Sequence, residues 1–144
     1  MTYDLAEALA ALHSYGIAHR DIKTDNLLFD DHFCLFLIDF EQTITVASEE
    51  EMVADPCGTR YWSAPGSIIF TEVTEGLYSP IRADRYSCGL VFDAISEFAW
   101  LDPATVTELK QFSRQLRATD PKTRPPLSKW RRSTNHRVLF SPPE

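Results

Sequence analysis

The segment 82–100 constrains the fold most, because it is apolar on nearly every side of a helix. Its apolar members are Tyr86, Cys88, Leu90, Val91, Phe92, Ala94, Ile95 and Phe98. A helix of this kind lies either in the middle of a globular domain or across a membrane. No apolar run in the chain approaches the roughly 18 residues that a membrane span needs. We therefore expect a helix buried at the centre of a globular domain.

Two amphipathic helices are expected to flank this central helix. Leucines recur at helical spacing before Gly16, a residue type that commonly follows a helix end, and Thr2 is the cap available at the start. Asp102 and Pro103 supply a cap and a first-turn proline for a second helix, which Pro121 ends. The inner faces carry Leu5, Leu9 and Leu12 in one helix and Val106, Leu109, Phe112 and Leu116 in the other.

A hairpin and a long loop occupy the region between the first two helices. Apolar runs at 26–29 and 33–40 flank Asp30-Asp31-His32, which predicts two strands with aspartates in the turn. From 41 to 65 the periodicity disappears, and a loop of this length usually has a function. A short helix is expected over 127–132. The sequence thus predicts a mainly α fold with a short β-hairpin, in one domain over 1–132 followed by a loosely held tail over 133–144.

Composition narrows the classes of partner. The formal net charge of −7 disfavours nucleic acid and anionic membrane surfaces, which are bound through clustered Lys and Arg. The three cysteines are odd in number and lack C-x-x-C spacing, so we expect neither a disulfide framework nor a zinc site. This favours an intracellular location, cytoplasmic or nuclear. His13, His32 and His136 share no ligand spacing and are expected on the surface.

The segment 19–26 matches the pattern H-R-D-x-K-x-x-N between the first helix and the hairpin. With it the chain resembles the eukaryotic-type protein kinases. The resemblance implies that Asp21 accepts the proton of the substrate hydroxyl, that Lys23 contacts the γ-phosphate of ATP and that Asn26 binds Mg²⁺. A lysine two residues after the aspartate is similar to the serine/threonine kinases. The alternative is that His19, Arg20 and Asp21 only hold a tight turn.

Asp39-Phe40-Glu41 stands at the end of the second expected strand, where kinases carry D-F-G. By the resemblance, Asp39 is the main Mg²⁺ ligand, because a carboxylate suits that hard cation. Phe40 is expected to pack under His19, and Leu28 to form the floor of the adenine site. Glu41 departs from the pattern, since glycine there lets the backbone swing, whereas glutamate restricts it and adds charge near the metal.

Three later segments continue the resemblance in order. Residues 58–66 resemble G-T-x-x-Y/W-x-A-P-E, residues 84–89 resemble D-x-W/Y-S-x-G and residues 120–125 resemble D-P-x-x-R-P. The resemblance implies that Asp84 braces the catalytic-loop backbone and that Arg124 pairs with the glutamate of A-P-E. That glutamate is Gly66 here. Because a buried arginine without its carboxylate costs several kcal/mol, and because 64–69 is an expected helical turn, Gly66→Glu is expected to stabilise the chain.

The glycines are Gly16, Gly58, Gly66, Gly76 and Gly89, so these residues form no G-x-G-x-x-G loop. We therefore expect the C-terminal lobe of a kinase domain without the N-lobe β-sheet, the N-lobe coming from upstream sequence or another chain. The pattern is closest to basidiomycete kinase-like proteins. One hypothesis is a serine/threonine kinase that uses ATP and Mg²⁺ and acts on protein substrates. The other is a non-catalytic, pseudokinase-like module that binds a partner protein. Alone, the chain is expected to bind ATP and Mg²⁺ weakly or not at all.

The acidic run Ser48-Glu49-Glu50-Glu51 leaves two interpretations open. It could supply the negative charge that kinases otherwise provide by phosphorylation and that Arg20 then grips. The favoured interpretation is a solvated acidic loop. Cys57, nearby in the same loop, is expected to be an ordinary unreactive cysteine.

Overall fold

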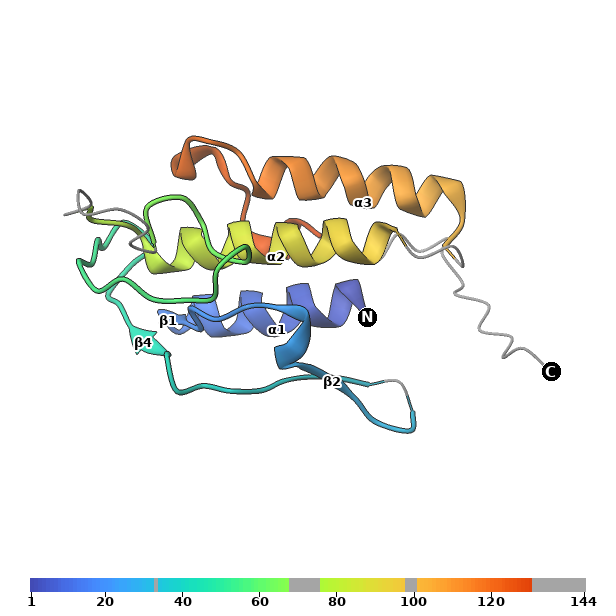
Figure 1. Ribbon diagram of the computed structural model, residues 1–144, viewed down its shortest axis with the longest axis horizontal. Helices are drawn as coiled ribbons and strands as arrows, with labels where there is room; N and C mark the ends of the chain where they lie inside the picture. Colours follow the sequence, from blue (N-terminus) through green and yellow to red (C-terminus); the bar gives the residue numbers. More distant parts are fainter. Residues whose placement is uncertain (33, 68–75, 98–100, 131–144) are drawn as a thin grey trace.

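A computed structural model describes residues 1–32, 34–67, 76–97 and 101–130 of the 144-residue chain. Three long helices lie side by side (Figure 1). In chain order the elements are α1 Thr2–Ser14, β1 Ile17–Ala18, η1 Thr24–Asn26, β2 Leu27–Phe29, β3 Leu35–Leu37, β4 Ile44–Thr45, α2 Pro80–Ser96, α3 Pro103–Leu116, η2 Pro121–Thr123 and η3 Leu127–Lys129. The β-hairpin lies along the outer side of α1, and the loop after β4 runs to the N-terminal end of α2. This mainly α architecture with short antiparallel strands is the predicted fold class.

Helix α2 lies between α1 and α3, which confirms the predicted central helix (Figure 1). Phe92 is fully buried among side chains of both neighbours, including Leu9 and Leu109. Burying an apolar side chain of this size stabilises a fold by roughly 1.5–3 kcal/mol. The helix starts at Pro80, earlier than predicted, because Ser79 caps it by accepting a hydrogen bond from the Arg82 amide at 3.2 Å. Residues 98–100 of the predicted helix lie outside the described residues.

The flanking helices end largely where their sequences predict. Gly16 follows α1 with a φ of 71°, and a β-carbon there would lie 2.2 Å from the Val46 carbonyl oxygen, so only glycine fits. The cap expected at Thr2 is wrong, since Met1 holds that position and its amino group contacts Asp4. The cap of α3 is confirmed: the Asp102 carboxylate accepts hydrogen bonds from the amides of the first turn at 3.1 and 3.0 Å.

The predicted hairpin is confirmed, with Leu27 opposite Leu37 and Leu28 opposite Phe36. Leu27 and Leu37 pack on the core, whereas Leu28 and Phe36 are exposed. The strands are shorter than predicted. The region expected to be all loop holds β4, which pairs antiparallel with β1, and a bridge between Val53 and Tyr78.

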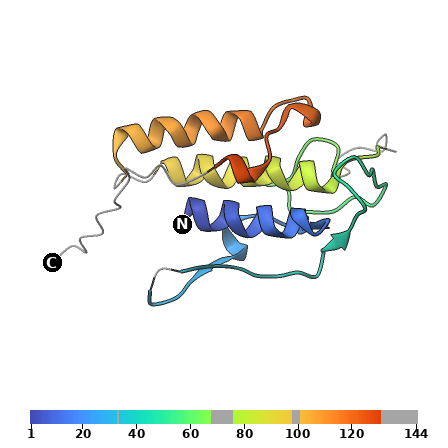
Figure 2. The same cartoon turned by 180° about the vertical axis from the view of Figure 1, so that it is seen from behind.

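The last described segment closes the back of the molecule. Figure 2 shows it lying across α2, and the Trp130 ring stacks on Tyr3 of α1 with 5.4 Å between centroids. The predicted final helix is a single 3₁₀ turn, η3, while 131–132 and the expected tail 133–144 lie outside the described residues. Within the described part of the chain, no helix is long and apolar enough to cross a membrane.

Candidate active site

The Asp21 carboxylate is the centre of a polar cluster just before η1. Lys23 Nζ donates to Oδ2 at 2.7 Å and Asn26 Nδ2 to the same oxygen at 3.1 Å, while Thr59 Oγ1 donates to Oδ1 at 2.6 Å. Lys23 Nζ also donates to Thr59 Oγ1 at 2.9 Å. Burial alone would raise the pKa of Asp21, but the hydrogen bonds from Lys23 and Thr59 outweigh burial and hold the pKa below its usual value. Asp21 is therefore an ionised hydrogen-bond acceptor at neutral pH.

A buried carboxylate from α2 holds the backbone in front of Asp21. The amides of His19 and Arg20 donate to Asp84 Oδ2 and Oδ1 at 2.7 and 2.8 Å. Arg20 has a φ of 69°, a conformation that costs a residue with a β-carbon about 1–2 kcal/mol. The two bonds to Asp84 fix this unfavourable turn, which aims the Asp21 side chain at Lys23 and Thr59.

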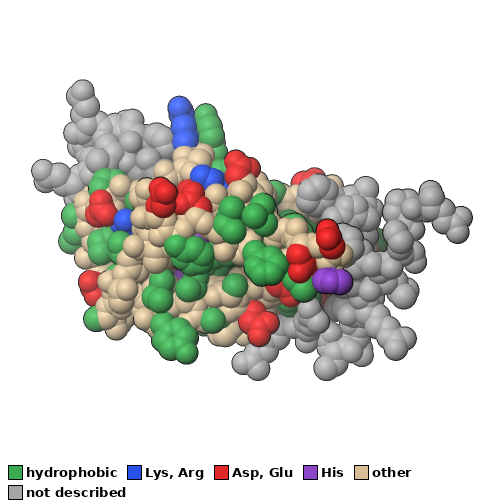
Figure 3. Space-filling view, turned by 90° about the horizontal axis from the view of Figure 1, so that it is seen from below, with side chains coloured by type: hydrophobic (Ala, Val, Ile, Leu, Met, Phe, Trp, Pro, Cys, Tyr) green, Lys and Arg blue, Asp and Glu red, His purple; other side chains and the backbone are tan. Residues whose placement is uncertain are grey.

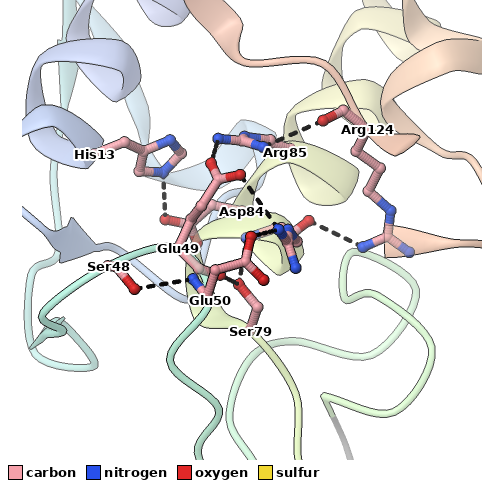
Figure 4. Close-up of polar contacts among 9 residues, drawn as sticks. His13, Ser48, Glu49, Glu50, Ser79, Asp84, Arg85 and Arg124 are labelled. Carbon is pink, nitrogen blue, oxygen red and sulfur yellow. Dashed lines mark hydrogen bonds and ion pairs between the residues drawn. The ribbon is translucent and has the colours of Figure 1, made fainter. Parts of the chain in front are cut away.

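His13 is not a surface residue, so that expectation is wrong. Its side chain is 8% exposed, and its Nε2 lies 3.1 Å from Asp84 Oδ2 (Figure 4). The ring lies in the last turn of α1, on the side that faces α2. His32 is exposed, as predicted, and His136 lies outside the described residues.

Arg20 pairs with Asp55 and not with the acidic run. Its Nη1 donates to Asp55 Oδ2 at 2.8 Å, and its Nε donates to the Gln42 carbonyl at 2.6 Å. Burial alone would lower the pKa of Arg20, but the bond to Asp55 outweighs it and raises the pKa. The interpretation in which Arg20 grips the acidic run is therefore wrong, because Glu49 and Glu50 contact two arginines of α2 (Figure 4). Glu50 and Glu51 are nevertheless exposed, as the interpretation of a solvated acidic loop predicts.

Asp39 and Asn26 are neighbours across the hairpin. The Ile38 amide donates to the Asn26 carbonyl at 3.0 Å, which continues the strand pairing up to the residue before Asp39. Asp39 is exposed and has a φ of 64°. The Phe40 ring meets His19 edge to face with centroids 4.9 Å apart, and His19 Nε2 donates to the Ile38 carbonyl at 3.0 Å. The segment 19–26 and the segment after β3 are thus held together.

These two residues fit a magnesium ion by their chemistry. The NH₂ group of Asn26 is used on Asp21, so its carbonyl oxygen is the atom left for a cation, and Asp39 supplies a carboxylate. Mg²⁺ prefers oxygen ligands and is usually held by one or two protein groups together with phosphate oxygens. Among the described residues, no group of three or more His, Cys, Asp or Glu side chains could hold a metal by itself.

The hairpin presents an apolar face on the outer side of the molecule. Leu28 and Phe36 face each other in the register and are each 52% exposed, and Phe40 is 47% exposed. Figure 3 shows hydrophobic side chains gathered over this side of the molecule. An apolar surface next to the Asp21 cluster suits the flat ring of a nucleotide base, the role that the resemblance implies for Leu28.

Arg124 is buried and has no carboxylate partner among the described residues. Its Nη1 donates to the Arg82 carbonyl at 2.9 Å and its Nε to the Ala118 carbonyl at 3.0 Å, and its guanidinium lies 4.9 Å from the centroid of the Tyr86 ring. Burial lowers its pKa. Gly66 is exposed with a φ of 86°, so it is not part of the expected helical turn. Backbone carbonyl oxygens therefore accept the hydrogen bonds of Arg124 in place of the glutamate that the kinase motif would supply.

Two residues of the site were not recognised from the sequence. Thr59 lies within the Gly-Thr motif, but a motif match does not reveal that its hydroxyl reaches Asp21. His13 stands alone in an amphipathic helix, and its spacing carries no signal for a partner on α2.

Cys57 agrees with its expected unreactive character, because burial raises the pKa of the thiol.

The fold and this site define the class of protein. Residues 1–135 match the protein-family profile described as "Protein kinase domain". The chain belongs to this family.

Its relatives carry names of serine/threonine kinases. The chain is 31% identical over 134 residues to serine/threonine-protein kinase ppk8 of Schizosaccharomyces pombe. The matched stretch covers 88% of this chain and 25% of that protein. It is 31% identical over 141 residues to CBL-interacting serine/threonine-protein kinase 24 of Arabidopsis thaliana, covering 97% of this chain and 30% of the relative. With serine/threonine-protein kinase grp of Drosophila melanogaster it shares 34% identity over 105 residues, 70% of this chain and 19% of the relative. The chain thus spans less than a third of each of these proteins.

Proposed function

We propose that the chain is the C-terminal lobe of a protein serine/threonine kinase domain, which transfers a phosphoryl group from ATP to a protein hydroxyl. The polar cluster on Asp21 carries the proposal. It combines a buried carboxylate with a lysine ammonium and an asparagine amide. Phosphoryl transfer depends mainly on positioning and on charge neutralisation, and this cluster supplies both.

Asp21 acts on the substrate hydroxyl. An ionised carboxylate accepts about four hydrogen bonds, and Lys23, Asn26 and Thr59 fill three of these positions. The remaining position has no partner among the described residues and would accept the hydroxyl of an incoming serine or threonine. Because the pKa of Asp21 is below its usual value, the carboxylate first orients this hydroxyl. It takes the proton only as the hydroxyl oxygen gives an electron pair to phosphorus and its O–H bond becomes acidic. This order suits the loose transition state of phosphoryl transfer.

Lys23 and the two metal-binding candidates act on the phosphates. The Lys23 ammonium lies 2.7 Å from the Asp21 carboxylate, so it places a positive charge beside the hydroxyl that attacks. Asn26 and Asp39 would hold Mg²⁺, which neutralises phosphate charge when bound. Leu28 would carry the base on the apolar side of the hairpin.

A non-catalytic role in binding a partner protein is the second candidate. Glu41 favours it, because it replaces a glycine beside Asp39 and adds a second carboxylate there. The lack of a glycine-rich phosphate loop within these residues favours it for the chain alone. An intracellular location and a likeness to basidiomycete kinase-like proteins remain predictions.

The test compares phosphorylation of a serine-rich protein by the native protein, tagged and purified from its source, with that by its Asp21→Asn variant. We expect the variant to lose about 10²-fold or more of the rate, while the matched variant Asp25→Asn keeps it. Activity that Asp21→Asn does not reduce would refute the catalytic role. Absence of phosphotransfer in both proteins would favour the non-catalytic candidate.

A calorimetric titration examines the chain by itself. The 144-residue chain should bind Mg-ATP no more tightly than about millimolar, because its five glycines form no glycine-rich loop of the kind that covers the phosphates. Micromolar affinity that Asp39→Asn abolishes would show that this expectation is wrong.

A further inference from the structure

The acidic run is folded onto the first turns of α2. Arg82 Nη2 contacts Glu49 Oε1 at 3.3 Å and also Glu50 Oε1, and Arg85 Nη2 contacts Glu49 Oε2 (Figure 4). Glu49 therefore bridges two arginines that are one helical turn apart. Glu51 takes no part in these contacts, because its carboxylate accepts a hydrogen bond from the Ala47 amide at 2.6 Å.

The two arginines depend on these glutamates for their compensation. Each arginine side chain is only 6% exposed, and the Nε atoms of both are buried without a hydrogen-bond partner among the described residues. The carboxylate of Glu49 is the anion that both share, and Arg85 has one further acceptor, the Arg124 carbonyl at 3.2 Å. The glutamate side chains are more open, at 41% exposed for Glu49 and 66% for Glu50. Removing Glu49 would leave Arg82 with Glu50 alone and Arg85 without a carboxylate among the described residues, which is unfavourable for buried cations.

The backbone at Glu49 is held at the same place. Ser79 Oγ donates to the Glu49 carbonyl at 2.7 Å and accepts a hydrogen bond from the Arg82 amide at 3.2 Å. One serine thus joins the cap of α2 to the acidic run. Main chain and side chain of Glu49 are both fixed to the same end of one helix.

The segment that follows Glu49 reaches the Asp21 cluster at Thr59, ten residues further along the chain. Val53 pairs with Tyr78, and the Tyr78 hydroxyl donates to the Asp55 carbonyl at 2.9 Å. Asp55 in turn pairs with Arg20, and Thr59 then donates to Asp21. The segment from Glu49 to Thr59 is therefore attached at four places: to α2 at Glu49, to Tyr78 at Val53, to Arg20 at Asp55 and to Asp21 at Thr59.

We propose that Glu49 is a positioning residue: through Arg82 and Arg85 it fixes the segment 49–59 to α2 and so keeps Thr59 on Asp21 without any modification of the segment. The catalytic consequence rests on the proposed function, whereas the structural one does not. Carboxylates of the chain itself thus pair with these arginines: Asp55 pairs with Arg20, and Glu49 pairs with Arg82 and Arg85.

Hydrogen exchange of the 144-residue chain tests the structural part. The Val53 and Cys57 amides donate to the Tyr78 and Ser67 carbonyls, so their exchange rates report whether the segment is attached. We expect Glu49→Gln to speed both by about tenfold or more, and the matched variant Glu51→Gln by less than twofold. Amides in the middle of α3 serve as the check that the variant is folded. Equal exchange in Glu49→Gln and the wild type, or equal effects of the two glutamine variants, would overturn the proposal.

A double-mutant cycle separates a specific pair from general damage. If Glu49 acts through Arg85, then Glu49→Gln adds less than twofold to the exchange rate in an Arg85→Gln background. Independent, multiplying effects would refute the pairing.

Kinetics of the native protein test the catalytic part. Glu49→Gln should raise the KM for the protein substrate at least fivefold and leave the KM for ATP within twofold, and Glu51→Gln should change neither. Equal rises in both constants would mean that Glu49 has no specific positioning role. If the native protein transfers no phosphate, the proposed function fails, while the exchange measurements still decide whether Glu49 fixes the segment.

Discussion

Replacing Asp84 by asparagine should destabilise the chain far more than the loss of one surface charge would. The wild-type carboxylate is 1% exposed and accepts hydrogen bonds from the His19 and Arg20 amides, with His13 also within 3.1 Å. Asparagine keeps one acceptor oxygen, so one of the two buried amides then faces an NH₂ group. An unsatisfied buried N–H costs about 1–3 kcal/mol, and loss of a charged acceptor adds to this. We expect the free energy of unfolding to fall by about 2–4 kcal/mol.

Urea denaturation of the 144-residue chain, followed by circular dichroism, measures this difference. The matched control is Asp93→Asn on the same helix, where the carboxylate is 42% exposed and lies 3.4 Å from Arg117. This surface substitution should leave the free energy of unfolding within about 0.5 kcal/mol of that of the wild type. Asp84→Ala should cost more than Asp84→Asn, because it leaves both amides without an acceptor. If Asp84→Asn lowers the free energy of unfolding no more than Asp93→Asn does, the buried carboxylate does not hold the backbone at His19 and Arg20.

Three further outcomes follow from the site and its surroundings. Gly66→Glu should lower the free energy of unfolding by about 1–2 kcal/mol, because its φ of 86° disfavours a β-carbon; a gain in the same urea assay would contradict this. Thr59→Val should raise the pKa of Asp21, since it removes a hydrogen bond to the ionised form; carboxyl ¹³C NMR titration measures the shift, and an unchanged pKa would exclude the contact in solution. For Glu49, burial alone would raise the pKa, but the bond to Arg85 and further arginine contacts outweigh it and place the pKa below its usual 4.5. The ionised Glu49 therefore contributes its full stabilisation of the fold above pH 4.5, and this contribution is lost as the pH falls through the pKa of Glu49 in the folded chain. The rate of pepsin cleavage between 41 and 58, divided by the rate for an unfolded reference peptide at the same pH, should rise over that acidic range in the wild type and stay constant in Glu49→Gln.

Strong local patterns predicted most of the fold. The apolar segment at 82–100 can only be buried, and the Asp102-Pro103 pair specifies a helix start by its own chemistry. The hairpin followed from two apolar runs around an aspartate turn. The pairing of β1 with β4 could not be predicted in this way, because strands of two residues are too short to show an alternating pattern.

The candidate site was predictable to the extent that its residues belong to one motif. Asp21, Lys23 and Asn26 lie within six residues of each other, so local geometry alone brings them together. The choice of partner for Glu49 was not predictable, since arginines at 20, 82 and 85 are all available to an acidic loop. Which pair forms depends on where the loop meets α2, and that is decided by the Val53–Tyr78 bridge and the Ser79 contact.

The exposed hairpin has a consequence for how the chain behaves in concentrated solution. Among the described residues β2 pairs only with β3, so each strand has an unpaired edge. Leu28 and Phe36 add exposed apolar side chains beside these edges. Open edges next to apolar side chains are sites where copies of a protein stack into aggregates. Strands of three residues and the charged turn at Asp30-Asp31 oppose this, because short edges and negative charge disfavour stacking. The solubility of the purified chain should therefore fall as the pH approaches its isoelectric point near 5.0, because the net negative charge that keeps the copies apart is then lost.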